Sequence, residues 1–181
     1  MEKNKQVFIR PLNEQDIEAS LDMQRRNREF FEKYSMTRSD DFYTKQAQAK
    51  RIRQQKEDRS NDAGYSFGIF KKKGDELIGA ISLFQILRDD LQSAFIGYFL
   101  DKDHNGKGYA TEAVELIVDF AFCELKLHRI EAGVMPHNLA SIRVLEKAGF
   151  HKEGIARKNV KINGKWEDHQ VLAIINSGDL D

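Results

Sequence analysis

Apolar and polar residues in the first half of the chain alternate in ways that predict strands and two helices. Val7 to Leu12 alternates like a half-buried strand, and Asn13 stands where a helix N-cap is expected. Polar residues dominate from Asp16 to about Phe31 and from Asp40 to about Asp58, which predicts two surface helices. Three β-like runs separated by turn residues then predict an antiparallel meander: Tyr65 to Phe70, Leu77 to Leu87 and Gln92 to Leu100.

The second half of the chain changes to an alternation of helix and strand. Thr111 to Lys126 carries polar residues on a narrow stripe only, so this predicted helix should lie against the sheet. Arg129 to Met135 is typical of a strand, and Leu139 to Ala148 of a helix with Gly149 as its C-terminal cap. A strand, a helix, a strand and a helix in succession indicate parallel pairing through right-handed crossovers.

The end of the chain predicts a β-hairpin. Asn163-Gly164 lies between two β-like runs, Phe150 to Lys161 and Lys165 to Ile175, and this dipeptide is a strong signal for a tight hairpin turn. Trp166 beside the turn is explained by hairpin packing or by a place at a substrate mouth. The predicted fold class is therefore α/β (α+β): a mixed sheet with an antiparallel N-terminal meander, parallel central strands, helices on both faces and a C-terminal hairpin.

A polar turn that contains glycine joins the meander to the Thr111 helix. Gly106, Gly108 and Ala110 allow the main chain to approach a ligand closely, and Lys107 adds a positive charge. The helix that follows leaves its first N–H groups unpaired at the positive end of its dipole, which favours an anion such as a phosphate. A turn that only connects strand to helix is the alternative.

The choice of phosphate ligand depends on the surrounding pattern. A P-loop needs GxxxxGK[ST], which the chain lacks. A dinucleotide fingerprint needs a third glycine where Thr111 stands, and it normally opens the first βαβ unit of a fold. Neither pattern fits.

Length and composition narrow the class of protein. With 181 residues, 40% of them hydrophobic and 32% charged, the chain is expected to form a single globular domain over residues 1–181. A net charge of zero argues against a non-specific nucleic-acid binder, and no apolar run is long enough to cross a membrane. The N-terminus lacks a signal-peptide core, so we expect a cytoplasmic protein without nucleic-acid or membrane partners.

Few residues suggest metal or thiol chemistry. The five histidines show no metal-ligand spacing on a helix, and we expect no metal site. Cys123 is the only cysteine and lies in an apolar run, which predicts a buried, inert thiol.

Positive charge is concentrated in one segment. Between Arg25 and Arg59 there are eleven Lys/Arg residues against six Asp/Glu residues. The segment forms either the solvated face of two surface helices or a basic rim for an acidic substrate or for cofactor phosphates, and both interpretations remain open.

Two segments resemble a known family. YFLDKDHNGKGYATEAVELIVDFAF resembles the cofactor-binding segment of the GNAT N-acetyltransferase superfamily, whose loop pattern is Gln/Arg-x-x-Gly-x-Gly/Ala. Gly108 and Ala110 take the two small positions, while Asn105 stands where the family most often has Gln or Arg. MPHNLASIRVLEKAGF resembles the next strand and helix of the family. Together with the hairpin ending GKWEDH, it is most similar to the branch of ribosomal-protein N-terminal (Rim-type) acetyltransferases.

The resemblance implies acetyl-CoA as the cofactor. Asn138 and Ser141 stand at positions expected near the pantetheine arm, although Asn138 is also a good helix N-cap. The implied cofactor-binding residues are Tyr98, Phe99, Leu100, Asn105, Gly106, Lys107, Gly108, Tyr109, Ala110, Thr111, Asn138 and Ser141.

The resemblance also implies catalytic roles. The thioester carbonyl oxygen should meet a backbone N–H on the strand before the glycine turn. Many members place a tyrosine in the second helix as the general acid, but Leu145 stands at that position. Ser141, one turn earlier, is the available substitute, or else a small residue in a crowded helix. Glu112 and Asp101 are candidate bases, each also explained as a structural carboxylate, and water is a further route for the proton.

The implied function is an acetyl-CoA-dependent N-acetyltransferase that acts on a primary amine. We expect a protein or peptide α-amine, such as that of a ribosomal protein, because its pKa of about 7.7 to 8.0 leaves far more of it neutral than lysine with about 10.4. The alternatives are a small-molecule acetyltransferase for polyamines or antibiotic-like amines and a non-catalytic acyl-CoA-binding regulatory domain. An oligomer is compatible with the sequence.

Overall fold

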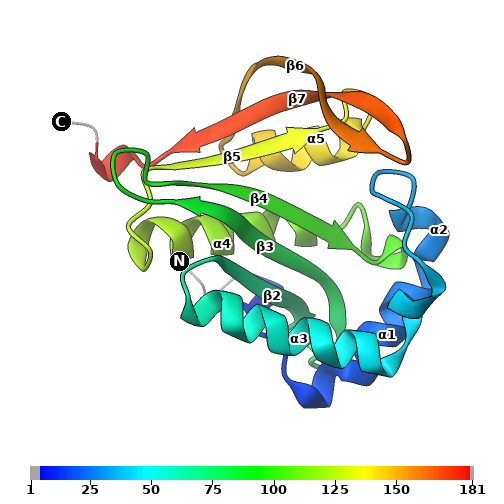
Figure 1. The fold of residues 1–181 in the computed structure, drawn as a ribbon. Coiled ribbons are helices and arrows are strands. Elements are labelled where there is room, and N and C mark those ends of the chain that lie inside the picture. Colours follow the sequence, from blue (N-terminus) through cyan, green and yellow to red (C-terminus); the bar gives the residue numbers. More distant parts are fainter. Residues whose placement is uncertain (1–4, 180–181) are drawn as a thin grey trace.

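The computed structural model describes residues 5–179, whose strands form one seven-stranded sheet in the order β1-β2-β3-β4-β5-β7-β6 (Figure 1). Neighbouring strands pair antiparallel except β4 and β5, which pair parallel. The strands are β1 (Val7–Arg10), β2 (Gly64–Lys71), β3 (Leu77–Leu87), β4 (Ser93–Leu100), β5 (Arg129–Val134), β6 (His151–Ile162) and β7 (Lys165–Ile175).

The predicted mixed sheet and C-terminal hairpin are confirmed, and the parallel part of the sheet is a single strand pair. The hairpin explains this limit: its second strand, β7, lies antiparallel to β5 along the whole of β5 and separates it from β6. Asn163 and Gly164 at the hairpin turn both have positive φ, 49° and 85°, as the Asn-Gly signal predicts.

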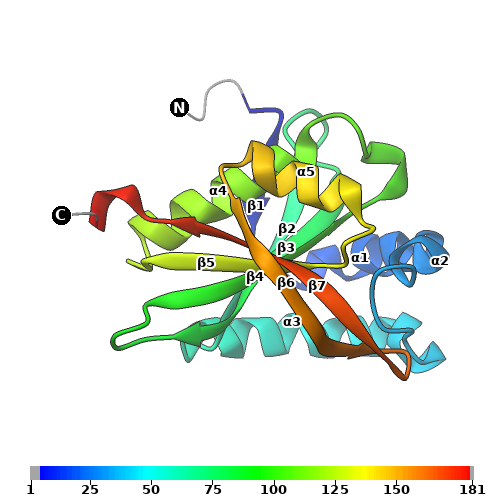
Figure 2. The ribbon, with the colours of Figure 1, turned by 90° about the horizontal axis from the view of Figure 1, so that it is seen from above.

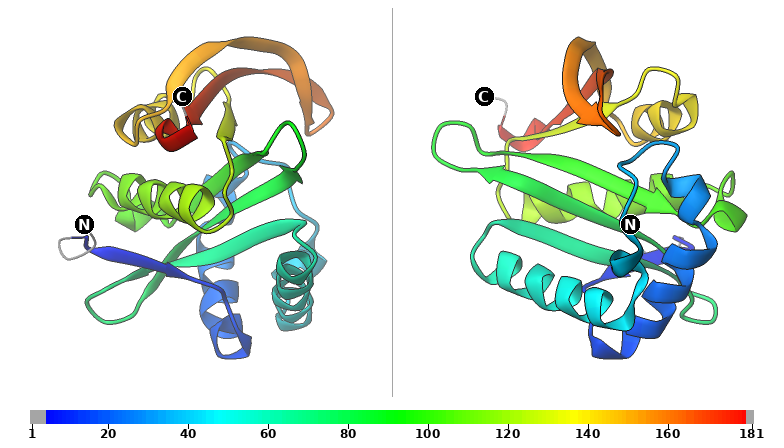
Figure 3. Two further views of the ribbon diagram at one scale, coloured as in Figure 1. Left: turned by 90° about the vertical axis from the view of Figure 1, so that its left-hand side faces the viewer. Right: turned by 45° about the vertical axis from the view of Figure 1, so that its right-hand side comes forward.

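Helices cover both faces of the sheet (Figures 2 and 3). α4 (Tyr109–Cys123) and α5 (Leu139–Lys147) lie on one face, where the apolar side of α4 enters the main core. α1 (Ile17–Arg26) and α3 (Lys45–Ser60) lie on the other face, and the short α2 (Arg28–Phe31) follows α1 at the end of the sheet. Among residues 5–179, no helix is both long and apolar enough to cross a membrane.

The first helical segment begins as predicted but contains a break. Asn13 accepts a hydrogen bond from the Gln15 N–H at 2.8 Å, and Asp16 accepts one from the Asn13 N–H at 2.8 Å, which forms a capping box. α1 ends at Asn27, whose side-chain amide donates to the Met23 carbonyl at 3.0 Å. The expected continuous helix over 16–31 is therefore divided into α1 and α2.

The C-terminal end of α4 corrects one expectation about the cysteine. Lys126 adopts a positive φ of 56°, and the Leu127 N–H donates to the Ala121 carbonyl at 3.0 Å, so the chain turns back and buries Leu127. The helix thus ends before Lys126, at Cys123. Cys123 is exposed, and the prediction of a buried thiol was wrong.

Candidate active site

The strands β4 and β5 diverge at the centre of the sheet. They pair only from Ser93 to Phe95, while the rest of β4, as far as Leu100, pairs with β3 alone. The N–H of Asp101 donates to Ile78 of β3 at 2.8 Å. Because successive residues of a strand turn their backbone groups to opposite edges, Leu100 and Tyr98 turn theirs toward the opening beside β5. Backbone donors are therefore free where a carbonyl oxygen was predicted to bind.

The glycine turn presents a second set of free backbone donors. Gly108 is the N-cap of α4, with φ of 84° and no side-chain cap, and the first helical bond is from the Glu112 N–H to the Gly108 carbonyl at 3.1 Å. The N–H groups of Tyr109, Ala110 and Thr111 are therefore left for a ligand. A Cβ on Gly106 or Gly108 would meet no atom within 4 Å, so the space beside the turn is open.

A cavity of about 920 Å³ connects this turn with α1, α2 and α3. It lies between two sets of residues. The glycine-turn wall consists of lining residues within 98–111 and 138–147, and the helical wall consists of lining residues within 24–51. Every predicted cofactor-binding residue except Lys107 lines the cavity. The Lys107 side chain instead donates to the Asp103 carbonyl at 2.9 Å.

The glycine-turn wall fits a ligand that carries several phosphates. Lys102, Arg143 and Lys147 line it, and none of the three has an ion-pair partner within residues 5–179. These cations and the free N–H groups of α4 together form an anion site of backbone and side-chain donors. The residues present therefore suit the phosphates of the predicted coenzyme.

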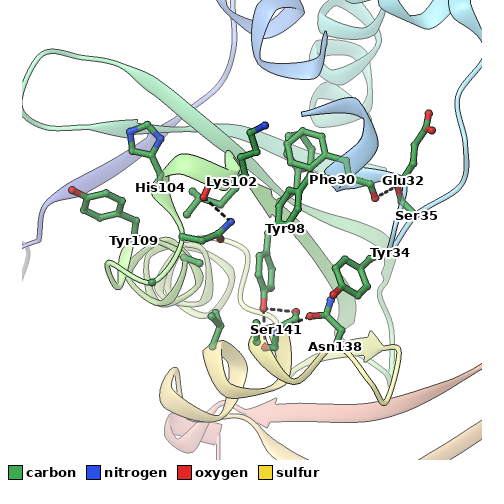
Figure 4. A pocket seen from close by; sticks show the side chains of 18 of the residues that line it. Phe30, Glu32, Tyr34, Ser35, Tyr98, Lys102, His104, Tyr109, Asn138 and Ser141 are labelled. Carbon is green, nitrogen blue, oxygen red and sulfur yellow. Dashed lines mark hydrogen bonds between the residues drawn. The ribbon is translucent and has the colours of Figure 1, made fainter. Parts of the chain in front are cut away.

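A tyrosine and a serine form a hydroxyl pair on the glycine-turn wall of the cavity. The Tyr98 and Ser141 hydroxyl oxygens lie 2.8 Å apart, and the Tyr98 hydroxyl also donates to the Ser141 carbonyl at 3.1 Å. Burial raises the pKa of Tyr98 to about 12, an effect that the Ser141 contact partly opposes. The phenol therefore stays protonated at neutral pH. Figure 4 shows Tyr98 between His104 and Tyr109 on one side and Phe30 and Ser35 on the other.

α5 holds Ser141 at this place. Asn138 is the N-cap of α5 and accepts a hydrogen bond from the Ser141 N–H at 3.2 Å, which confirms the capping interpretation of this residue. Asn138 also lines the cavity. Leu145, one turn further along, is fully buried in the core.

Asp101 does not line the cavity. Its carboxylate is 1% exposed and accepts hydrogen bonds from the Asp103 N–H at 3.1 Å and from Arg26 Nε at 2.7 Å. Burial alone would raise the pKa of Asp101, but these hydrogen bonds outweigh it and hold the pKa below the usual value. The carboxylate is thus ionised, its oxygens are engaged by Arg26 and Asp103, and it joins α1 to the end of β4.

Glu112 also lies outside the cavity lining. Its carboxylate accepts hydrogen bonds from the backbone N–H groups of Gln6 at 2.7 Å and Val7 at 3.2 Å. It therefore ties the start of α4 to β1. The structure brings neither predicted base to the hydroxyl pair.

The helical wall carries one carboxylate among the described lining residues, that of Glu32. Glu32 Oε1 accepts hydrogen bonds from the Tyr43 hydroxyl at 3.2 Å and from the Arg38 N–H at 3.3 Å. In Figure 4 the Glu32 side chain points away from Tyr98 and Ser141. Its position suits it to hold the helical wall together.

The sequence did not indicate a side-chain role for two residues of the cavity. Tyr98 was expected to contribute its backbone alone, and the alternation of β4 would have placed its phenol on one of the two faces without identifying which. His104 lies within the polar turn, and its buried Nδ1 has no partner among the described residues. Trp166 is 55% exposed and lies outside the described lining of this cavity.

Comparisons with known proteins agree with this geometry. Residues 6–151 match the acetyltransferase (GNAT) domain family. The chain is 65% identical over 179 residues to the probable N-acetyltransferase YjcK of Bacillus subtilis (strain 168), with 99% of both chains covered. It is similar to the crystal structure of ribosomal-protein-S5-alanine acetyltransferase from Vibrio fischeri, with a TM-score of 0.90, 31% identity and coverage of 99% of this chain and 98% of that one.

A second similar structure contains a coenzyme. It is RimJ of Mycobacterium smegmatis in complex with CoA-disulfide, with a TM-score of 0.90, 27% identity and coverage of 97% of this chain and 84% of that one. The predicted family, fold and coenzyme are thus confirmed. With its splayed β4 and β5, its uncapped α4 and its match over residues 6–151, the chain belongs to the GNAT family of acetyl-CoA-dependent N-acetyltransferases.

Proposed function

We propose that this N-acetyltransferase transfers an acetyl group to the N-terminal α-amine of a protein, and that ribosomal proteins are the first class to test. The observation that carries the proposal is the hydroxyl pair of Tyr98 and Ser141 on the glycine-turn wall of a cavity whose other wall has a different chemistry. The glycine-turn wall suits the coenzyme, and the helical wall is left for the acceptor. The resemblance to Rim-type enzymes supports a protein acceptor in the cytoplasm.

The residues of the cavity supply the groups that the reaction needs. Acetyl-CoA supplies the acetyl group as a thioester. The backbone N–H groups of Tyr98 and Leu100 donate to the carbonyl oxygen as negative charge develops on it. As the amine nitrogen bonds to the carbonyl carbon and the carbon–sulfur bond breaks, Ser141 Oγ donates its proton to the sulfur and regains one from the water that takes the proton of the amine. Tyr98 positions the Ser141 hydroxyl.

The base requirement favours an α-amine. The one carboxylate in the described lining points away from the hydroxyl pair, so the acceptor loses its proton to water. An α-amine with a pKa of about 7.7 to 8.0 is substantially neutral near pH 7, whereas lysine with about 10.4 is not. A site without a strong base therefore suits the first acceptor better than the second.

Mass spectrometry of peptide mixtures tests this assignment. Peptides with free and with blocked N-termini, each containing an internal lysine, are incubated with acetyl-CoA and the purified protein. We expect acetylation at the free α-amine only. Efficient acetylation of the blocked peptides, or of small polyamines alone, would contradict the α-amine proposal and leave the coenzyme site intact.

A further inference from the structure

In the basic segment from Arg25 to Arg59, three arginines near the cavity already have acceptors within the protein. Arg26 forms an ion pair with Asp101, Arg28 with Asp40, and Arg25 donates to the Tyr43 carbonyl. Within this segment, the cations that line the cavity are Arg38 and Arg51. Neither has an ion-pair partner within residues 5–179. Within the basic segment, the arginines with local acceptors thus fit the interpretation as a structural surface, and Arg38 and Arg51 fit the interpretation as a basic rim for an anion.

Arg38 and Arg51 lie on one small patch of the helical wall. Their guanidinium carbons lie 5.3 Å and 5.9 Å from the centre of the Phe42 ring. Arg51 Nη1 has one weak contact, to Gln48 Oε1 at 3.4 Å. The neighbouring carboxylate of Glu32 is already occupied by Tyr43 and by the Arg38 backbone. The guanidinium donors of both arginines thus remain available.

Holding this charge without a partner is unfavourable for the free protein. Burial, with a smaller contribution from Arg38, lowers the pKa of Arg51 to about 10, so the side chain is still charged at neutral pH. A half-buried cation with unused donors gains most from an anion that replaces its lost hydration. A carboxylate matches the planar fork of arginine with two parallel hydrogen bonds.

The position of the patch assigns the anion to the second substrate. The phosphate site lies on the glycine-turn wall, with its own cations and backbone donors. Arg38 and Arg51 belong to the helical wall. Figure 4 shows Phe30 and Ser35 of this wall across Tyr98 from His104 and Tyr109 beside the glycine turn. Resting on the proposed function, we infer that Arg38 and Arg51 select acceptors with an acidic side chain close to the N-terminal amine.

Pairs of peptides that differ only by aspartate or asparagine at one position test whether the enzyme selects acidic acceptors. A peptide with aspartate at the second, third or fourth position is compared with its asparagine counterpart, with kcat/KM measured at saturating acetyl-CoA. We expect at least one position at which aspartate is preferred by roughly ten- to a hundredfold, in the range of truncated interfacial charge pairs. Equal rates at all three positions would overturn the inference and leave the α-amine assignment in place.

Substitutions connect the preference to these residues. Arg51→Gln and Arg38→Gln should each reduce the preference for aspartate at that position to a few-fold or less, with the KM for acetyl-CoA unchanged. Arg53→Gln is the matched control, because Arg53 is exposed on the same helix and lies outside the cavity lining. Retention of the full preference in both cavity variants would contradict the inference.

A binding measurement separates this inference from the proposed function. Isothermal titration of the CoA-saturated protein with each peptide, and with free aspartate, reports affinity without turnover. Tighter binding of the aspartate peptide, lost in Arg51→Gln, supports the carboxylate site even if no α-amine is acetylated. If free aspartate bound as tightly as the aspartate peptide, the acceptor would be a small acidic amine, which would contradict the inference of an acidic peptide. Equal binding of the aspartate and asparagine peptides would overturn the inference.

Discussion

The two walls of the cavity are built in different ways. The glycine-turn wall offers mainly backbone N–H groups, which the start of α4 and the free edge of β4 supply over a short stretch of sequence. The helical wall offers side chains from α1, α2 and α3, and contacts with residues far away in the sequence hold this wall in place. A backbone site depends on conformation and open space, so few residue types satisfy it, whereas a side-chain site changes with each substitution.

The comparison predicts that the largest effect comes from a backbone change in the glycine turn. Gly108→Val places a β-branched residue at a φ of 84° and fills the open space beside the turn. We expect acetyl-CoA affinity to fall at least about a hundredfold, or roughly 3 kcal/mol, and the thermal stabilisation by acetyl-CoA to disappear. Thermal denaturation with and without acetyl-CoA measures both.

Gly74→Val is the matched control for this change. Gly74 also has a positive φ, 90°, and a Cβ there would meet no atom within 4 Å, but the residue lies outside the cavity lining. The control should lose stability by about 1–3 kcal/mol from backbone strain and keep its response to acetyl-CoA. An unchanged coenzyme affinity in Gly108→Val would contradict the assignment of this wall to backbone donors.

The next largest effect should come from Ser141. Ser141→Ala removes the proposed proton donor, and we expect turnover to fall roughly ten- to a hundredfold because the donor acts mainly in the transition state. The KM for acetyl-CoA should change little. Steady-state kinetics measure both parameters. Wild-type turnover in this variant would contradict proton donation by Ser141 and leave it only a packing role.

A smaller effect is expected at Tyr98. Tyr98→Phe keeps the ring and removes the hydrogen bonds to Ser141, which should lower turnover about three- to tenfold. In Ser141→Ala the same change should have almost no further effect, because both residues act through one proton. With the pKa of Tyr98 at about 12, the phenol remains a donor across the alkaline range, so wild-type kcat/KM should show no fall below pH 10.

The smallest effect concerns the support of the helical wall. Asn163 at the hairpin turn accepts a hydrogen bond from the Thr37 N–H at 2.9 Å, across 126 positions of sequence. Asn163→Gly preserves the positive φ of the turn and removes the acceptor, so the KM for the peptide should rise about two- to threefold with acetyl-CoA affinity unchanged. Asn163→Asp keeps the oxygen and should behave like the wild type. Identical peptide KM values in all three proteins would show that this contact does not position the wall.

The sequence predicted best the features that depend on neighbouring residues. The capping roles of Asn13 and Asn138, the positive φ of Gly149 and the Asn163-Gly164 turn each follow from local backbone chemistry. The glycine turn belongs to the same class. Periodicity likewise identified the strands and the apolar side of α4, because burial on one face leaves a regular pattern.

The sequence could not predict the contacts between distant segments. Asp101 and Glu112 were candidate bases, but their partners are Arg26, 75 positions away, and the backbone of Gln6, 106 positions away. Periodicity alone also did not reveal the break at Asn27, where the side-chain amide bonds to both Met23 and Lys102, 75 positions away. The side-chain direction of Tyr98 depends on which face of β4 meets α5, and the sheet topology decides that.

The helical wall is one continuous stretch of chain, and this has a consequence for how new specificities arise. The stretch from 24 to 51 carries no free backbone donor that the coenzyme site requires. Around the cavity it contacts the rest of the chain through the pairs Arg26–Asp101, Asn27–Lys102, Phe31–Phe99, Tyr34–His137 and Thr37–Asn163. A replacement for this stretch therefore has to retain these anchor points and the buried contact between Ser20 and Gln48. Within those constraints, the acceptor wall can change while the glycine turn and its backbone donors stay as they are.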